Sequence, residues 1–237
     1  MTPDELERYA RQIILREVGG AGQQALGKAR VLIVGAGGLG GPAGLYLAAA
    51  GVGHIGIVDD DVVALSNLHR QIQFRTENIG ASKTQVMGES LSAVNPHIHV
   101  QEHRQNLDAN NAKSIIKSYD LVLDGTDNFP TRFLVNGTCL ATNTPLISGA
   151  LGQFDGQLAA FKMDGHSACY QCFVPQEPPN AQTCAQVGVM GALPGIIGSM
   201  MAMEALKIIT HAGEPLYGRL FLYDALRATA RTITLPK

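Results

Sequence analysis

A glycine-rich segment, residues 35–40 with sequence GAGGLG, carries the clearest chemical signal in this sequence. It has the pattern G-x-G-x-x-G and lies between an apolar run that predicts a strand over 30–34 and an Ala- and Leu-rich run that predicts a helix over 39–50. Glycines there permit a tight turn and a close backbone approach to a phosphate, which the helix N-terminus binds through its amides. Asp59, at the end of the next predicted strand (54–58), is placed to bind ribose hydroxyls. Together these features predict a nucleotide site, without distinguishing NAD from ATP.

Three further charged residues, Arg70, Lys83 and Asp127, are candidates for the same site. Asp127 follows a predicted strand over 121–123, and ligands gather where the carboxyl ends of parallel strands meet. Two cations and a further carboxylate suit the attack of a carboxylate on an α-phosphorus, because the cations offset phosphate charge and an Asp can hold Mg²⁺. A hydride-transfer site needs no such set. Taken singly, each has a simpler interpretation: a surface ion pair for Arg70, a solvated helix residue for Lys83, and a helix cap for Asp127.

The four cysteines are too few for a disulfide scaffold of this length, which favours a reducing, cytoplasmic location. Cys169 and Cys172 have C-x-x-C spacing, half of a four-ligand zinc site, with His166 as a conceivable third ligand. Cys184 lies in a loop before a glycine-rich helix, where a thiol can have a lowered pKa and act as a nucleophile. Cys139 lies in an apolar helix and is predicted to be a core residue.

Strand and helix signals alternate through the first 150 residues, which predicts a parallel sheet with right-handed crossovers. Predicted helices cover 2–16, 23–26, 39–50, 82–94 and 128–142, and predicted strands cover 30–34, 54–58, 98–103, 121–123 and 145–148. The first helix begins with a capping box, Thr2 to Glu5, with Pro3 at its first position. After residue 150 the pattern changes to an antiparallel strand (157–163), a Pro- and Cys-containing loop (165–186), a glycine-rich helix (187–203) and strands at 220–223 and 229–235.

We therefore predict an α/β fold: a Rossmann-like, mostly parallel sheet flanked by helices, with antiparallel C-terminal strands. The 237 residues form one domain, divided into an N-terminal helical segment (1–28), a nucleotide-binding α/β part (29–150) and a C-terminal part (151–237). The net charge of −2 offers no basic patch for nucleic acid or a membrane surface. The uncharged run 187–203 meets Glu204 before it reaches the roughly 20 residues that a membrane span needs. We expect a buried helix whose glycines let another backbone approach closely.

A series of segments occurs in one order along the chain: 8–12 (RYARQ), 35–40, Asp59, 66–71 (SNLHRQ), Lys83, 124–128 (DGTDN), 169–172 (CYQC) and 183–185 (TCA). In that order they resemble the ThiF/MoeB/HesA family, relatives of the ubiquitin-activating enzymes, over nearly the whole chain. The resemblance implies ATP- and Mg²⁺-dependent adenylation of the C-terminal glycine of a ubiquitin-like sulfur-carrier protein. That carrier would be ThiS-like or MoaD-like, in thiamine or molybdopterin biosynthesis. A sulfur donor, such as a sulfurtransferase, then captures the acyl group, and residues 151–237 bind the carrier and include a crossover loop.

The resemblance also implies roles for individual residues. Asp59 and Asn67 hold the ribose and nearby phosphate, and a homodimer is implied in which Arg11 enters the partner's nucleotide site. Alone, Arg11 has the pattern of a surface residue on an amphipathic helix. The nucleotide-binding set is Arg11, Gly35, Gly37, Gly38, Gly40, Asp59, Asp61, Asn67, Arg70, Lys83, Asp127 and Asn128. The catalytic set is Arg70, Lys83, Asp127 and Cys184, with Asp127 organising Mg²⁺.

Two questions about the cysteines stay open at this point. In the family a second C-x-x-C follows the last strand, and this sequence reaches Lys237 where that pair would be expected, so zinc at Cys169 and Cys172 is undecided. Cys184 belongs to a loop that forms a covalent link in the thiamine branch and is dispensable for adenylation in the molybdopterin branch. Two other functions also remain: an NAD-dependent oxidoreductase and a non-catalytic nucleotide-binding scaffold. Arg70, Lys83 and Asp127 speak against both.

Overall fold

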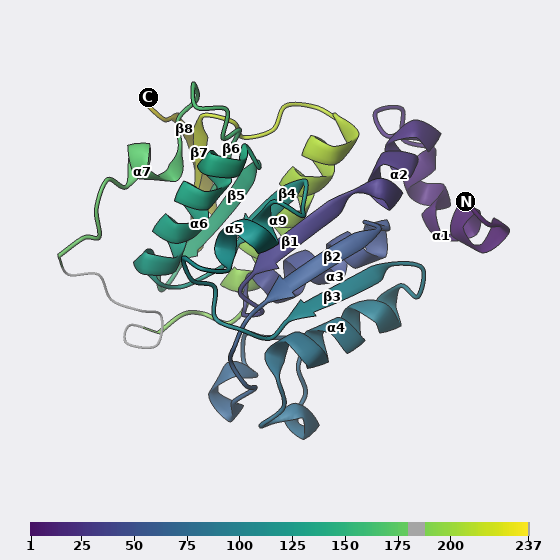
Figure 1. The fold of residues 1–237 in the computed structure, drawn as a ribbon, viewed down its shortest axis with the longest axis horizontal. Coiled ribbons are helices and arrows are strands. Elements are labelled where there is room, and N and C mark those ends of the chain that lie inside the picture. The colour runs from purple at the N-terminus through teal and green to yellow at the C-terminus, as the bar shows by residue number, and fades with distance from the viewer. Residues whose placement is uncertain (180–187, 237) are drawn as a thin grey trace.

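The computed structural model describes residues 1–179 and 188–236, and in them one mixed sheet runs through the molecule (Figure 1). Its strand order is β3-β2-β1-β4-β5-β6-β7-β8. The strands are β1 (Arg30–Val34), β2 (His54–Val58), β3 (His99–His103), β4 (Leu121–Asp124), β5 (Leu146–Leu151), β6 (Asp155–Phe161), β7 (Arg219–Asp224) and β8 (Thr229–Thr234). Strands β3, β2, β1, β4 and β5 pair in parallel, whereas β5 to β8 pair antiparallel. The predicted fold class is confirmed.

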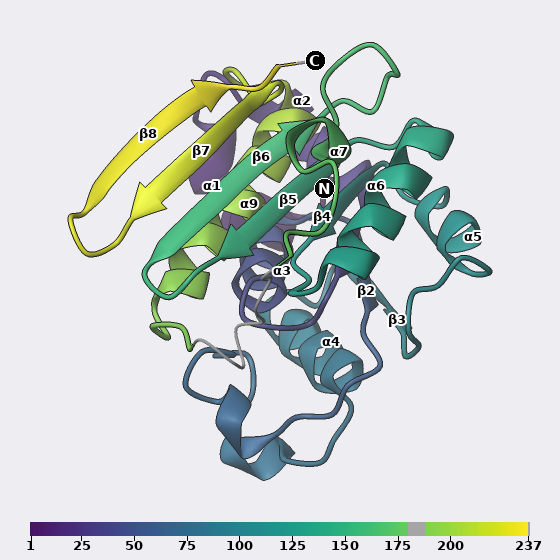
Figure 2. The ribbon, with the colours of Figure 1, turned by 90° about the vertical axis from the view of Figure 1, so that its left-hand side faces the viewer.

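Helices cover both faces of the sheet (Figure 2). They are α1 (Pro3–Ile13), α2 (Gly19–Lys28), α3 (Gly40–Ala50), α4 (Lys83–Val94), α5 (Ala112–Ile116), α6 (Phe129–Thr142), α7 (Tyr170–Phe173) and α9 (Leu193–Thr210), with 3₁₀ turns η1 (Leu65–Asn67) and η2 (Thr76–Asn78). Strand β1 shows why two layers form: Val31 and Ile33 pack in the core beneath α3, α4 and α9, while Leu32 and Val34 pack in the core beneath α5 and α6. Side chains of a strand alternate between faces, so a continuous apolar run buries both.

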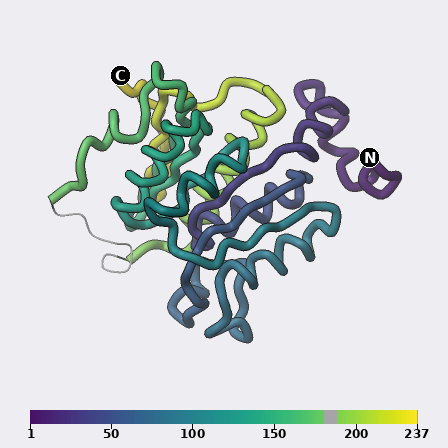
Figure 3. Tube along the Cα trace, in the orientation of Figure 1, coloured from purple at the N-terminus to yellow at the C-terminus, as the bar shows by residue number. Residues whose placement is uncertain are grey.

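Element boundaries follow the sequence closely where turn residues are decisive. Strands β1 and β2 have the predicted bounds, and Thr2 and Glu5 form the predicted capping box. Helix α1 ends at Ile13 rather than near residue 16, and α2 begins at Gly19 and ends at Lys28 rather than spanning only 23–26. Strand β5 extends to Leu151 because its antiparallel partner β6 continues the ladder to that residue. The helices α1 and α2 and the strand β8 lie on opposite sides of the molecule (Figure 3).

Helix α9 is the element that could be mistaken for a membrane span. Among the described residues it alone is long and apolar enough to cross a membrane, judged by length and composition. It packs against α3, β5 and β6, and a Cβ on Gly198 would stand 2.5 Å from the Leu39 carbonyl oxygen. This agrees with a core helix that another backbone approaches closely. It spans 193–210 rather than 187–203, because Pro194 occupies its first turn and His211 ends it in a left-handed conformation.

Candidate nucleotide-binding site

A cleft of about 640 Å³ lies at the carboxyl ends of the parallel strands, within the size range of small-molecule sites. Residues at or directly after the ends of β1, β2 and β4 line it. This is the edge of the sheet at which the sequence predicts a nucleotide. Of the predicted nucleotide-binding residues, those that line it are Gly35, Gly37, Gly38, Asp59, Asp61, Arg70, Lys83, Asp127 and Asn128. Gly40, Asn67 and Arg11 do not line it.

The glycine-rich loop joins β1 to α3, and two of its glycines are required by geometry. Gly35 has φ +94°, a conformation that side-chain-bearing residues rarely adopt. A Cβ on Gly40 would stand 2.0 Å from the Gly35 carbonyl oxygen. Gly40 therefore allows the helix to begin directly above the strand, and it acts through packing rather than through contact with the cleft.

Asp59 fastens this loop to the end of β2. Its Oδ2 accepts from the Ala36 N–H at 2.7 Å and its Oδ1 accepts from the Asp61 N–H at 2.8 Å. Burial raises the pKa of Asp59, and the two backbone donors together with the Lys83 charge oppose that rise. Each carboxylate oxygen retains a lone pair, so Asp59 can still accept from a ribose hydroxyl.

Lys83, the first residue of α4, is buried rather than solvated. Its side chain is 7% exposed, and its Nζ lies 2.7 Å from Asp61 Oδ2, while the Asp61 side chain is 67% exposed. The interpretation of Lys83 as a solvated helix residue is therefore wrong. The Lys83 ammonium group lies in the cleft wall and pairs with a carboxylate that faces solvent. It can turn to a bound phosphate, because water can then solvate the Asp61 carboxylate in place of the ammonium group.

Arg70 and Asn67 are positioned less directly by the structure. Arg70 Nη1 donates to the Ser66 carbonyl at 2.9 Å and lies 2.8 Å from His69 Nε2. No carboxylate of the described residues is within ion-pair distance of Arg70, so its surface ion-pair interpretation has no support. Asn67 Oδ1 accepts from the Ala64 N–H at 3.0 Å. It closes the η1 turn, and its predicted role at the phosphate remains a prediction.

The strand β4 presents Asp127 at the cleft through a short turn. Buried Asp124 accepts from both the N–H and the hydroxyl of Thr126, which shapes that turn. Asn128 Oδ1 accepts from the Thr131 N–H at 2.9 Å and caps α6, so the helix-cap interpretation of Asp127 is wrong. Asp127 is exposed in the cleft and is available to hold a cation. The carboxylates of Asp59, Asp60 and Asp61 also lie within 4.8 Å of one another.

Three buried polar residues at the site were not predicted: Gln71, Gln73 and Arg132. Arg132 lines the cleft and donates from Nη2 to the carbonyls of Thr126 and Gly149. It occurs on the buried face of α6 with Val135, Asn136 and Cys139, and a charged residue in such an i, i+3, i+4, i+7 pattern was an available signal. Gln71 lines the cleft and lay inside the SNLHRQ segment, whereas Gln73 had no signal in the sequence.

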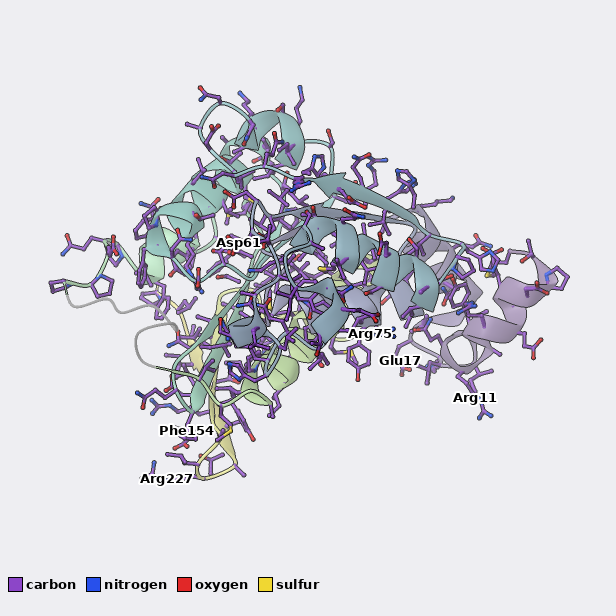
Figure 4. The ribbon with its side chains drawn as sticks, turned by 90° about the horizontal axis from the view of Figure 1, so that it is seen from below. Arg11, Glu17, Asp61, Arg75, Phe154 and Arg227 are labelled. Atoms are coloured by element: carbon purple, nitrogen blue, oxygen red, sulfur yellow. The ribbon has the colours of Figure 1, made fainter. Side chains whose placement is uncertain are left out.

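Arg11, Cys139, Cys169 and Cys172 lie outside this cleft. Figure 4 shows Arg11 on the N-terminal helices, well away from Asp61, and Arg11 is exposed. Cys169 Sγ and Cys172 Sγ are 3.1 Å apart. No further His, Cys, Asp or Glu among the described residues joins them in a ligand cluster, His166 included. Among the described residues these two cysteines supply half of a four-ligand zinc site, and zinc binding stays undecided. Cys184 lies outside the described residues, and Cys139 is buried as predicted.

Comparison with known proteins identifies relatives over nearly the whole chain. The ThiF family matches residues 9–237. The chain is 48% identical over 240 residues to a sulfur carrier protein adenylyltransferase of Thermus thermophilus, an alignment that covers 99% of this chain and 89% of that protein. It is 46% identical to the adenylyltransferase and sulfurtransferase MOCS3-2 of Zea mays, where it spans about half of the relative (98% of this chain, 48% of that protein).

Solved structures agree on the fold. A crystal structure of E. coli MccB with ATP has a TM-score of 0.85 to this chain at 23% identity, and the match covers 97% of this chain and 72% of that one. At this identity the likeness concerns the fold alone. The family match extends over almost the whole sequence, and the identity to the Thermus protein is close to one half. The chain therefore belongs to the ThiF family.

Proposed function

We propose that this protein is an ATP-dependent adenylyltransferase that activates the C-terminal glycine of a ubiquitin-like sulfur-carrier protein. The observation that carries the proposal is the gathering of Arg70, Lys83 and Asp127 around the glycine-rich loop in one cleft. The relative from Thermus thermophilus is a sulfur carrier protein adenylyltransferase, which supports the same reaction. Membership of the family speaks against an NAD-dependent oxidoreductase, and the charged set speaks against a non-catalytic scaffold.

In the proposed reaction the carrier carboxylate attacks the α-phosphorus of ATP and pyrophosphate leaves. A C-terminal carboxylate is already ionised near neutral pH, so the site needs no general base. Catalysis then comes from orientation and from stabilisation of the developing charge. Arg70 and Lys83 bind the phosphates, with Lys83 turning from Asp61, and the loop amides bind them from the other side. Bound Mg²⁺, held by Asp127, would offset charge on the pyrophosphate.

We further propose that the enzyme is a homodimer in which Arg11 of each protomer completes the nucleotide site of the other. Arg11 is exposed and distant from its own cleft (Figure 4), so it can reach a nucleotide only in another copy. A sulfurtransferase that acts on the adenylate is the expected further partner, and Cys184 is a candidate for the covalent step. Cytoplasmic location stays a prediction from the few cysteines.

The proposed function is tested by ATP–pyrophosphate exchange with purified ThiS-like and MoaD-like carriers, together with a titration of NAD. We expect exchange that depends on a carrier and disappears when the terminal glycine of that carrier is removed. Asp127→Asn, which keeps the side-chain shape, should abolish exchange in a folded protein. Exchange without any carrier, or reduction of NAD, would refute the proposal.

A further inference from the structure

Gln73 holds the glycine-rich loop from outside the cleft. Its Nε2 donates to the Ala36 carbonyl at 2.9 Å and to the Gly37 carbonyl at 3.1 Å. The residue is buried, with 6% exposed, and its own carbonyl accepts from Ser90 Oγ of α4 at 3.1 Å. Because two carbonyl oxygens face the side-chain amide, the NH₂ group must point at them, which fixes the orientation of the amide.

The peptide groups that flank Ala36 are thereby fixed on both sides of the residue. The Ala36 N–H donates to Asp59, and the Ala36 carbonyl accepts from Gln73. The Gly37 carbonyl also accepts from the Gly41 N–H at 3.0 Å. Neither Gln73 nor Ala36 lines the cleft, whereas Gly37 does. The carbonyl oxygens, which would repel a phosphate, are therefore bound away from the cleft, as a loop that binds anions through its amides requires.

The side-chain oxygen of Gln73, Oε1, is buried and has no hydrogen-bond partner among the described residues. A Cβ on Gly41 would stand 2.0 Å from it, so a glycine at position 41 leaves room for the amide. A buried carbonyl oxygen without a partner lowers stability, which offsets part of the gain from the two donated hydrogen bonds. The net contribution of Gln73 to folding is therefore small, and its two hydrogen bonds act mainly on the conformation of the loop.

We propose that Gln73 is a positioning residue of the nucleotide site, which sets the loop conformation that binds the triphosphate, with Gly41 as its spatial complement. It does not contact the nucleotide, because it lies behind the loop. The inference rests on the proposed ATP-dependent function and deepens it.

Gln73→Met tests the proposal, since it keeps the length of the side chain and removes both donated hydrogen bonds. It replaces one unpartnered buried oxygen, Gln73 Oε1, by another, the Ala36 carbonyl, so we expect the melting temperature to stay within about 3 °C of wild type. The KM for ATP should rise about tenfold, from the loss of two neutral hydrogen bonds. The KM for the carrier and kcat should change less than about twofold. Gln85→Met, at an exposed position of α4, is the matched control and should leave all constants unchanged.

Gly41→Ala perturbs the same contact from the other side. Alanine favours the helix over glycine, yet its Cβ displaces the Gln73 amide, so the KM for ATP should rise as in Gln73→Met. In a Gln73→Ala background, Gly41→Ala should have no further effect, because no amide remains to be displaced. Additive effects, or an unchanged KM for ATP in folded Gln73→Met, would overturn the inference. Calorimetry with a non-hydrolysable ATP analogue and no carrier tests the role of Gln73 in nucleotide binding separately from the proposed adenylation of a carrier. If wild type binds the analogue but never supports exchange, only the proposed function fails.

Discussion

Replacing Lys83 by methionine removes the ammonium group from the nucleotide cleft while it keeps an unbranched side chain of similar length. The Lys83 side chain is 7% exposed, and its one ion-pair partner among the described residues is Asp61, which is two-thirds exposed. A pair with one solvated member contributes roughly 0–1 kcal/mol to folding. Burial of the charge opposes even that, so the free energy of unfolding should change by less than about 1 kcal/mol.

The effect on catalysis should be much larger. Removing one preorganised donor from a developing oxyanion costs about 10²–10³ in rate. A hundredfold loss of kcat/KM corresponds to about 2.7 kcal/mol of transition-state stabilisation, at roughly 1.36 kcal/mol for each factor of ten. Asp61→Asn should cost less than about tenfold, because Asp61 holds Lys83 when no nucleotide is bound and does not itself stabilise the transferred charge.

The measurement is ATP–pyrophosphate exchange at saturating carrier, with thermal melts of each variant beside it. Lys113→Met, at an exposed position of α5, controls for loss of a positive charge elsewhere. If folded Lys83→Met retains exchange within about threefold of wild type, Lys83 does not bind the phosphates. If Asp61→Asn is as damaging as Lys83→Met, the two residues act as one unit and the assignment of separate roles is wrong.

Three further predictions concern assembly, pH and packing. Arg11→Ala and Asp127→Ala should each be inactive alone. Random mixing of the two variants should restore about a quarter of wild-type exchange, because half the dimers are mixed and each mixed dimer has one complete site of two. If mass spectrometry shows that the subunits have mixed and exchange does not recover, the site is not shared. Burial, with the charges of Arg30 and His99, lowers the pKa of His54, so the folded state favours neutral His54: its contribution to stability is complete above the unfolded pKa of about 6.5 and declines as the pH falls below it. In melts between pH 7.5 and 5.5, wild type should lose stability relative to His54→Asn as the pH falls, and parallel curves would contradict this. Gly40→Ala should lower the free energy of unfolding by about 2 kcal/mol or more, because its Cβ meets a backbone oxygen. Gly137→Ala, which has open space around it in α6, should raise that free energy by up to about 1 kcal/mol. Urea titration measures both.

Much of the fold follows from local rules that act within a few residues. Alternating apolar runs, the Thr2 capping box and the glycine loop depend on short-range sterics and hydrogen bonds, and they place β1, β2 and α3 within one residue of their observed bounds. The edge at which Asp59 and Asp127 meet follows from the parallel topology. What could not be predicted depends on tertiary packing. It includes the burial of Lys83 and the contact of Gln73 with a loop more than thirty residues earlier. It also includes the N-cap of α6, which is Asn128 and not Asp127.

The two side chains that fix Ala36 also determine when the loop becomes ordered. Asp59 and Gln73 are both contributed by the folded chain, so the backbone freedom of the loop is lost during folding and not when a nucleotide arrives. Fixing one residue costs about 1–2 kcal/mol in conformational entropy. A preorganised loop removes that cost from the binding step, and affinity for the nucleotide is correspondingly higher. The same preorganisation predicts that nucleotide association proceeds in one kinetic phase, with no slow rearrangement of residues 35–40.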